Sequence, residues 1–254
     1  MNNADFISRR RFLIGGGAAL GGLLLPACSK TKAPPTYGNL LRMGDNLTYF
    51  AQRTLLPGQS LVREYSQREI SAFPAIGAVS PDRPGARGYS ETYRRLKQGG
   101  FEDWRLVVEG SVDRPGAYSL ADLKRFTSRT QITRHSCEEG WTAIAEWTGV
   151  QLSRVLLAAG VRRTACCVCF HTYDSDLVDS IDMLDALHPQ TLLAYAMNGQ
   201  DLLIRHGAPL RLRVERQIGY KSRKYLSRIV VKDTFEDGDD KGFASIGWAW
   251  YTGI

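Results

Sequence analysis

The residues TQITRHSCEEGW, from Thr130 to Trp141, are the stretch from which the fold can best be deduced. The first four residues are rich in β-branched side chains and alternate in character, which predicts a β-strand. Cys137 comes shortly after this strand, which would hold the thiol in a fixed place, as a metal or cofactor ligand requires. A single cysteine is more often buried and inert, so both interpretations stand at this point.

Two basic segments further along the chain favour the functional interpretation. HGAPLRLR runs from His206 to Arg213, and GYKSRK runs from Gly219 to Lys224. Charged side chains and clustered backbone amides both bind phosphate oxygens, so segments of this kind suit a phosphorylated cofactor.

Taken in order, the strand, Cys137 in a C-x-E-x-W setting, H-G-A-P-L-R-L and G-Y-K-S-x-K resemble the molybdopterin-binding domain of the sulfite oxidase family. The similarity is greatest to its bacterial haem-free branch, which includes the periplasmic methionine sulfoxide reductases. The resemblance covers roughly residues 105–254 and, more loosely, the chain from Asn46 onwards.

The composition is that of a globular protein, with 254 residues, 43% of them hydrophobic and 23% charged. Such a chain can bury one large core or form at most two domains. Its formal charge of +7 suits an anionic ligand or an anionic membrane surface. Nucleic acid is not an expected partner, because the basic residues are interleaved with acidic ones and no binding motif is present.

The amino terminus has the pattern of an export signal. SRRRFL, from Ser8 to Leu13, leads into the uncharged 16-residue run Phe12–Ala27. A membrane-spanning helix needs about 20 residues, so the run predicts a twin-arginine signal peptide over residues 1–28 and a periplasmic or cell-envelope location. An uncleaved membrane anchor is the alternative. Leu25-Pro26-Ala27-Cys28 resembles a lipobox, in which Cys28 would carry the lipid; ordinary cleavage nearby is the other interpretation.

The remaining chain divides into a linker, 29–45, and an oxidoreductase domain, 46–254. Leu40–Leu56 is compatible with a helix, and the proline-rich residues 57–100 predict long irregular structure. Further helices are expected over Leu120–Phe126, capped by Ser119, and over Leu152–Ala159. Strands are expected over Arg105–Val112, Ala165–Thr172, Leu192–Met197, Leu210–Val214 and Tyr225–Val231. Strands outnumber helices without alternating with them, so the fold class is α+β.

The five cysteines are odd in number and do not predict a disulfide framework. Cys166 and Cys169 have C-x-x-C spacing, which is also typical of a redox pair or half a metal site. Alternation along a strand would place these two thiols on opposite faces, which favours packing over chemistry.

The resemblance implies a mixed β-sheet domain that binds molybdenum through molybdopterin, with Cys137 as the metal ligand; a soft thiolate suits such a metal. His135, and less so Arg134, could keep the thiol ionised. The other cofactor-binding residues that the resemblance implies are Asn46, Tyr49, Phe50, Thr172, His206, Arg211, Ser222, Arg223 and Lys224. For the last three, backbone amides would form an anion-binding concavity. Tyr49 and Phe50 are equally compatible with a helix whose aromatic side chains pack in the core; relatives often have glutamate at position 50 and asparagine at position 206.

The implied reaction is a two-electron oxygen-atom transfer at sulfur or nitrogen. Sulfite oxidases have an arginine shortly after the ligand cysteine and a tyrosine in D-Y-K-G-F, but this chain has Glu138 and Glu139 after the cysteine and Asp240 in the tyrosine's place. Acidic residues disfavour a doubly charged substrate, so reduction of an S-oxide or N-oxide is expected, with no catalytic acid or base assigned. Sulfite oxidation, a non-catalytic envelope lipoprotein and a thiol oxidoreductase are the alternatives.

Two further expectations concern partners and domains. Residues 244–254 leave no room for the immunoglobulin-like domain that sulfite oxidases append, and no haem attachment motif is present. Electrons would therefore come from a separate partner, either a membrane cytochrome or a quinol-linked subunit.

Overall fold

The computed structural model describes residues 43–56, 58, 60–235 and 247–254. The expected signal peptide, the lipobox and most of the linker lie outside these residues, as does the segment around Asp240. No helix within the described ranges is long and apolar enough to cross a bilayer.

The first of two sheets has the strand order β2-β1-β10-β5-β6. These strands are β1 (Leu106–Gly110), β2 (Gly116–Tyr118), β5 (Cys167–Thr172), β6 (Asp179–Asp182) and β10 (Leu226–Lys232). β1 runs parallel to β10 and every other pair is antiparallel, so the sheet is mixed. The adjacent strands β1 and β10 are far apart in sequence, so their pairing brings the beginning and the end of the domain together.

The second sheet contains the stretch that ends at Cys137. Its strands are β3 (Ser128–Ser136), β4 (Thr142–Gln151), β7 (Leu192–Met197), β8 (Gln200–Asp201) and β9 (Arg211–Arg213). Their order is β3-β4-β7-β8, with β9 also pairing with β7. β3 alternates between buried and less buried residues along its second half, as its sequence predicts, with Gln131, Thr133 and His135 on the buried side.

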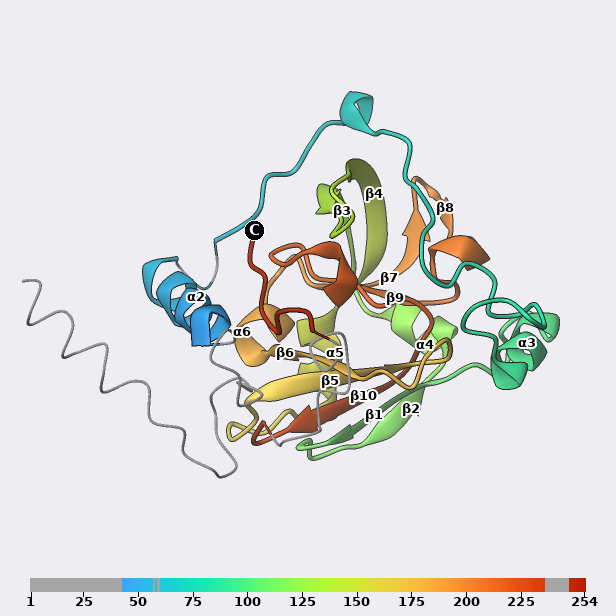
Figure 1. Ribbon diagram of the computed structural model, residues 1–254. Helices are drawn as coiled ribbons and strands as arrows, with labels where there is room; N and C mark the ends of the chain where they lie inside the picture. The colour runs from blue at the N-terminus through green and yellow to red at the C-terminus, as the bar shows by residue number, and fades with distance from the viewer. Residues whose placement is uncertain (1–42, 57, 59, 236–246) are drawn as a thin grey trace, which may run out of the picture.

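Helices α4 (Leu120–Arg125) and α5 (Leu152–Ala159) lie between the two sheets (Figure 1). Ser119 caps α4 as predicted, because its hydroxyl accepts a hydrogen bond of 3.1 Å from the Asp122 amide. The predicted apolar face of α5 is fully buried in the core cluster, which draws residues from both sheets. The prediction of an α+β fold is confirmed.

The structure corrects the prediction for residues 57–100 at one end. Helix α3 (Glu91–Gln98) forms there, with Ser90 accepting a hydrogen bond of 3.2 Å from the Tyr93 amide. Tyr93 is the only buried residue of α3, so the helix shows little apolar periodicity in sequence. Between α2 (Met43–Leu55) and α3, the described residues form only the short helix η2 (Gln67–Glu69) and irregular chain, as expected.

Helix α2 (Met43–Leu55) confirms the helix expected within Leu40–Leu56 and takes in the last three residues of the predicted linker. Helix α6 (Met183–Ala186) lies close to it in Figure 1. Two single-turn helices, η3 (Ile204–His206) and η4 (Gly219–Lys221), follow β8 and β9 and lead into the site described next.

Candidate cofactor-binding site

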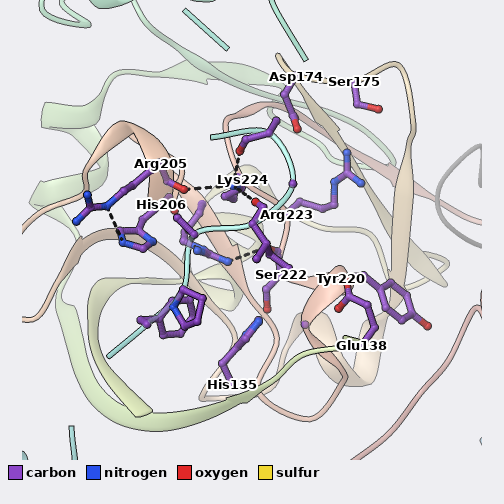
Figure 2. Close-up of a pocket in the computed structure, with 18 of the residues that line it drawn as sticks. His135, Glu138, Asp174, Ser175, Arg205, His206, Tyr220, Ser222, Arg223 and Lys224 are labelled. Atoms are coloured by element: carbon purple, nitrogen blue, oxygen red, sulfur yellow. Dashed lines mark hydrogen bonds between the residues drawn. The ribbon is translucent and has the colours of Figure 1, made fainter. Parts of the chain in front are cut away.

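A cavity of about 220 Å³ lies where distant parts of the chain meet (Figure 2). One wall is the end of β3 with the turn between β3 and β4, the second is the irregular segment 73–78, and the third is formed by residues 205–224 around η3 and η4. Arg87 and the chain between β5 and β6, through Asp174, Ser175 and Leu177, complete the lining. Predicted site residues that line it are His206, Arg211, Ser222, Arg223 and Lys224, together with His135.

Cys137 sits in the turn that closes the β3–β4 hairpin. Its amide donates a hydrogen bond of 2.9 Å to the Trp141 carbonyl, and its carbonyl accepts one of 3.1 Å from the Gly140 amide. Gly140 has a φ of 88°, which favours glycine at that position. Cys137 itself is buried and is not a lining residue, but His135, Glu138 and Trp141 around it all line the cavity.

The surroundings of the Cys137 thiol disfavour its ionised form. Burial raises its pKa to about 11; the hydrogen bond from the Glu139 amide, 3.4 Å from Sγ, opposes this shift, and the nearby Glu138 carboxylate adds to it. Neither His135 nor Arg134, the cations suggested by the sequence, is among the groups that shift the pKa of this thiol. Binding a metal here would release a proton.

His135 is held neutral by a buried chain of polar side chains. An Arg213 guanidinium nitrogen lies 2.7 Å from His135 Nδ1, and the same guanidinium forms a double contact with Glu215 at 3.0 and 2.7 Å. Because arginine can only donate, Nδ1 accepts and the ring proton is on Nε2. Burial, followed by repulsion from Arg213 and Arg211, lowers the pKa of His135 to about 2.

His135 also explains a glycine of the second basic segment. A side chain at Gly219 would overlap the His135 ring at Nε2, so only glycine permits this close approach. Arg134, in contrast, is exposed, as the strand alternation predicts.

Arg211 is buried and links the two ends of the third wall. Its guanidinium donates hydrogen bonds of 3.0 Å each to the backbone carbonyls of His206 and Ser222, and it lies 4.9 Å from the centre of the Trp147 ring. Burial and the nearby Arg213 lower its pKa to about 9. Its Nε is buried and has no hydrogen-bond partner within the described part of the chain.

Lys224 ties the irregular segment to the C-terminal wall. Its ammonium donates hydrogen bonds to the carbonyls of Ile76 at 2.9 Å and Arg205 at 3.2 Å, and also to that of Ala78. Burial, followed by repulsion from Arg211, lowers its pKa to about 7. Lys224 thus orders the segment that covers the cavity as well as contributing charge.

Arg223 connects the cavity to Thr172. Its guanidinium pairs with the buried Asp179 carboxylate at 2.8 Å and donates to the Thr172 hydroxyl at 3.2 Å. Thr172, at the end of β5, does not line the cavity but contacts a residue that does.

Two of the three backbone amides that were predicted to bind an anion already donate hydrogen bonds within the protein, so the prediction is wrong for these two. The Ser222 amide donates to the Gly219 carbonyl at 2.9 Å, and the Arg223 amide donates to that of Lys221 at 3.0 Å. Both amides are used within the turn at η4, which a motif alone does not reveal. His206 contributes a neutral ring, because burial and then Arg211 lower its pKa to about 4.

The structure does not bring Asn46, Tyr49 or Phe50 to the cavity. All three lie on α2, where the Tyr49 hydroxyl donates a hydrogen bond of 2.9 Å to Asp182. Tyr49 packs against Trp250 and Tyr251, as in the alternative interpretation of a helix with a packed aromatic, and Phe50 is exposed.

Phe73 is a site residue that the sequence did not indicate. Its ring lies 5.1 Å from that of His135, 5.4 Å from Trp147, 5.8 Å from Trp141 and 5.8 Å from His206. It stands in an irregular segment without periodicity, so only its neighbour Pro74 marked the region.

The four described cysteines form no disulfide, and the described residues hold no group of three metal-ligating side chains. Cys169 is buried in β5, and the half-buried Cys166 packs against the cluster of Cys167, Phe235, Trp250 and Tyr251. This environment agrees with a packing role for the C-x-x-C segment.

The residues present fit an anionic cofactor with a soft metal. Cationic side chains converge on one cavity, the Arg211 Nε is a buried donor without a partner, and the Cys137 thiol stands beside the cavity. Arg211, Arg223 and Lys224 would hold the anionic part, and Cys137 would hold the metal.

Comparison with known proteins agrees with this chemistry. Residues 94–239 match the family described as oxidoreductase molybdopterin binding domain. A protein of Azospira oryzae, provisionally named protein-methionine-sulfoxide reductase subunit YedZ1, is 32% identical over 94% of this chain and 87% of its own length. The protein-methionine-sulfoxide reductase catalytic subunit MsrP of Campylobacter jejuni is 30% identical over 60% of this chain and 57% of its own length.

MsrP of Xanthomonas campestris is 35% identical over 50% of this chain and 44% of its own length, so the chain spans about half of these MsrP relatives. Among solved structures, the sulfane dehydrogenase SoxCD of Paracoccus pantotrophus is similar over 52% of this chain and 39% of that chain. The TM-score of this match is 0.50 and the sequence identity is 26%. The similarity supports the sulfite oxidase type of molybdopterin-binding fold.

Proposed function

This chain belongs to the oxidoreductase molybdopterin binding domain family, and from that premise we propose that it is an exported reductase of uncharged S-oxides or N-oxides. Its cofactor is molybdenum bound to molybdopterin, with Cys137 as the protein ligand. The observation that carries the proposal is the convergence of the Cys137 hairpin with Arg211, Arg223 and Lys224 at one cavity. When bound, the cofactor supplies two-electron transfer of an oxygen atom.

Each wall of the cavity has a separate task in this proposal. Arg211 and Lys224 attract the anionic end of the cofactor, and their hydrogen bonds to backbone carbonyls keep the walls in place. Phe73 and Trp141 provide apolar surface that excludes water. His135, which is neutral and protonated at Nε2, supplies a hydrogen-bond donor without adding positive charge.

Glu138 favours uncharged substrates. It lines the cavity and follows the ligand cysteine, so its carboxylate would repel a doubly charged anion such as sulfite. Similarity to relatives named methionine sulfoxide reductases supports an S-oxide as the substrate class.

We also propose a separate electron donor and a location in the cell envelope. Two relatives are named as subunits, which supports a partner such as a membrane cytochrome or a quinol-linked protein. The arginines before Phe12 support twin-arginine export, and Cys28 supports a lipid anchor. Metabolic labelling with a palmitate analogue tests the anchor: label that persists in Cys28→Ser would contradict it.

The activity is tested with protein that is expressed with its signal and with a cofactor supply. We expect about one molybdenum atom per chain and oxidation of a reduced dye by methionine sulfoxide. Cys137→Ala should abolish turnover, whereas Cys166→Ser should retain it. Sulfite oxidation faster than S-oxide reduction would instead indicate a sulfite-oxidising enzyme. A metal-free protein that is active on thiols would indicate a thiol oxidoreductase.

A further inference from the structure

Helix α2 presents its polar side to the protein and its apolar side outwards. Tyr49, Gln52 and Arg53 lie on the inner side, and each contacts the body through a polar group. The outer side carries Leu47, exposed to 55%, and Leu55, exposed to 78%. A helix packed only against a protein core has the opposite arrangement.

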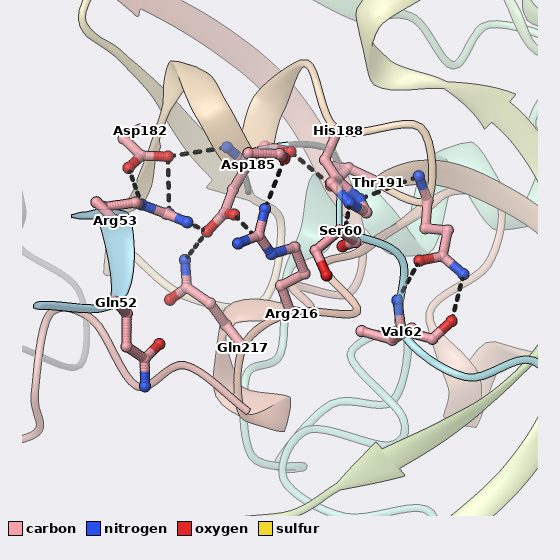
Figure 3. A network of polar contacts seen from close by, with 12 residues as sticks. Gln52, Arg53, Ser60, Val62, Asp182, Asp185, His188, Thr191, Arg216 and Gln217 are labelled. Atoms are coloured by element: carbon pink, nitrogen blue, oxygen red, sulfur yellow. Dashed lines mark hydrogen bonds and ion pairs between the residues drawn. The ribbon is translucent and has the colours of Figure 1, made fainter. Parts of the chain in front are cut away.

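Buried ion pairs fix this orientation (Figure 3). Arg53 contacts Asp182 at 2.9 Å and Asp185 at 2.7 Å, with all three side chains almost inaccessible to solvent. Gln52 accepts a hydrogen bond of 2.8 Å from the Tyr251 hydroxyl. Turning α2 to bury its leucines would leave two buried carboxylates without Arg53, so the outward apolar face is a stable feature of the fold.

Helix α6 and the segment between α2 and η2 carry further exposed apolar side chains. A side chain at Gly58 would be in contact with Leu184, and the Ser60 carbonyl lies 3.0 Å from His188 Nε2, so the two regions are adjacent. Together they form what we term the α2–α6 patch: Leu47, Phe50, Leu55, Leu56, Leu61, Leu184 and Leu187, all exposed. Exposed apolar side chains that share one surface mark a site of interaction.

We propose that the α2–α6 patch rests on the surface of a lipid bilayer. The chain directly before α2 is the argument for this occupant. Only residues 28–42 separate α2 from the uncharged run Phe12–Ala27, and these 15 residues reach at most about 50 Å. α2 is thus the first described element after Cys28, the proposed site of the lipid anchor. An amphipathic helix with leucine and phenylalanine on one side lies in the plane of the interface.

The inference rests on the proposed membrane anchor at the amino terminus but not on the proposed reductase activity. Loss of the anchor would show in the palmitate labelling, whereas the patch itself is tested by its contacts with lipid. Membrane association through the amino terminus alone would not orient the domain, whereas the patch would place α2 and α6 against the headgroups.

Photo-crosslinking in cells tests the occupant of the patch directly. The full-length chain is expressed with p-benzoylphenylalanine in place of Leu47 and, as a control, in place of Leu203. Leu203 is exposed to 50% and follows β8, which lies far from α2 in Figure 1. We expect phospholipid adducts at position 47 and none at position 203. An adduct with another protein, an adduct with a second copy of this chain, or no adduct at position 47 would each overturn the proposal.

A second measurement asks whether the patch acts as one surface. With the crosslinker in place of Leu184, the double variant Leu47→Glu/Leu55→Glu should lower the lipid adduct at least about tenfold, because two buried leucines are lost from the interface. The matched control Leu157→Glu/Leu203→Glu should leave the adduct unchanged. An adduct that persists in the first variant would contradict the proposal, and thermal melting confirms that both variants fold.

Discussion

Lys224 and Arg211 illustrate how a residue that binds a ligand also builds its own site. Both are buried cations that donate to backbone carbonyls, and both lie in a cavity with few counter-charges. Their pKa values are lowered by burial and then by a neighbouring cation, which is Arg211 for Lys224 and Arg213 for Arg211. The protein alone is therefore destabilised locally, and an anion in the cavity would relieve that cost.

The Lys224 ammonium predicts a pH dependence of stability. Its pKa is about 7 in the folded protein, against an ordinary value of 10.5, so the unfolded chain holds more protons between these two values. Stability contributed by this group therefore rises as pH increases from 7 towards 10.5. We compare wild type with Lys224→Met, both without cofactor. The unfolding free energy of the wild type minus that of Lys224→Met should be larger at pH 8.5 than at pH 6.5. Urea denaturation at both pH values measures this, and parallel changes in the two proteins would contradict the assignment.

Glu215 is the counter-charge of the buried Arg213 that holds His135. Because Glu215→Gln leaves a buried guanidinium without its partner, we expect a loss of about 3–5 kcal/mol in unfolding free energy. Glu109→Gln is the matched control, since its pair with Arg228 is half exposed, and it should cost at most about 1 kcal/mol. Equal effects in urea denaturation would show that the buried chain of side chains does not support the site.

At the scale of single residues, the sequence indicated chemistry better than geometry. The residue types of Cys137, Arg211 and Lys224 pointed to a cofactor, and the structure brings all three to one region. The protonation of Cys137, the neutral His135 and the use of the Ser222 amide within its own turn depend on burial and on distant partners. No local pattern encodes these, and Phe73 was missed for the same reason.

Among the elements, the β3–β4 hairpin is the one on which the site depends. Its nine paired positions, from Ser128 with Val150 to Ser136 with Thr142, place the Cys137 turn at its end. The strand before Cys137 was predictable because β-branched residues and alternation are local signals. Helix α3 was not predictable, because a helix with a single buried residue shows no apolar periodicity in its sequence.

Gly149 controls the contact between β4 and β7. An added side chain would overlap the backbone carbonyl of Leu193 at a register shift in the ladder, so the strands would have to separate. We expect Gly149→Ala to lower the unfolding free energy by about 1–3 kcal/mol. Gly116→Ala is the control, because an added side chain there meets nothing within 4 Å, and it should change stability by less than about 0.5 kcal/mol. Similar urea denaturation midpoints for the two variants would contradict this account of the contact between β4 and β7.

For the whole molecule, the cavity exists because two sheets and an irregular segment meet. The α+β class followed from the sequence, but the parallel pairing of β1 with β10 and the placing of segment 73–78 over the cavity are non-local. The inverted orientation of α2 is also a property of the whole fold, since Arg53 is buried by partners on α6. This is why Asn46 and Tyr49, assigned to the cofactor by motif, lie elsewhere in the structure.

X-ray absorption at the molybdenum edge tests most directly that Cys137 holds the metal beside this cavity. Wild type and Cys137→Ser are prepared with equal cofactor supply, and the number of sulfur neighbours of molybdenum is compared. The proposed ligation predicts one sulfur fewer in Cys137→Ser, or a protein without molybdenum. Full molybdenum content with an unchanged sulfur count in that variant would show that the thiol at position 137 is not the ligand.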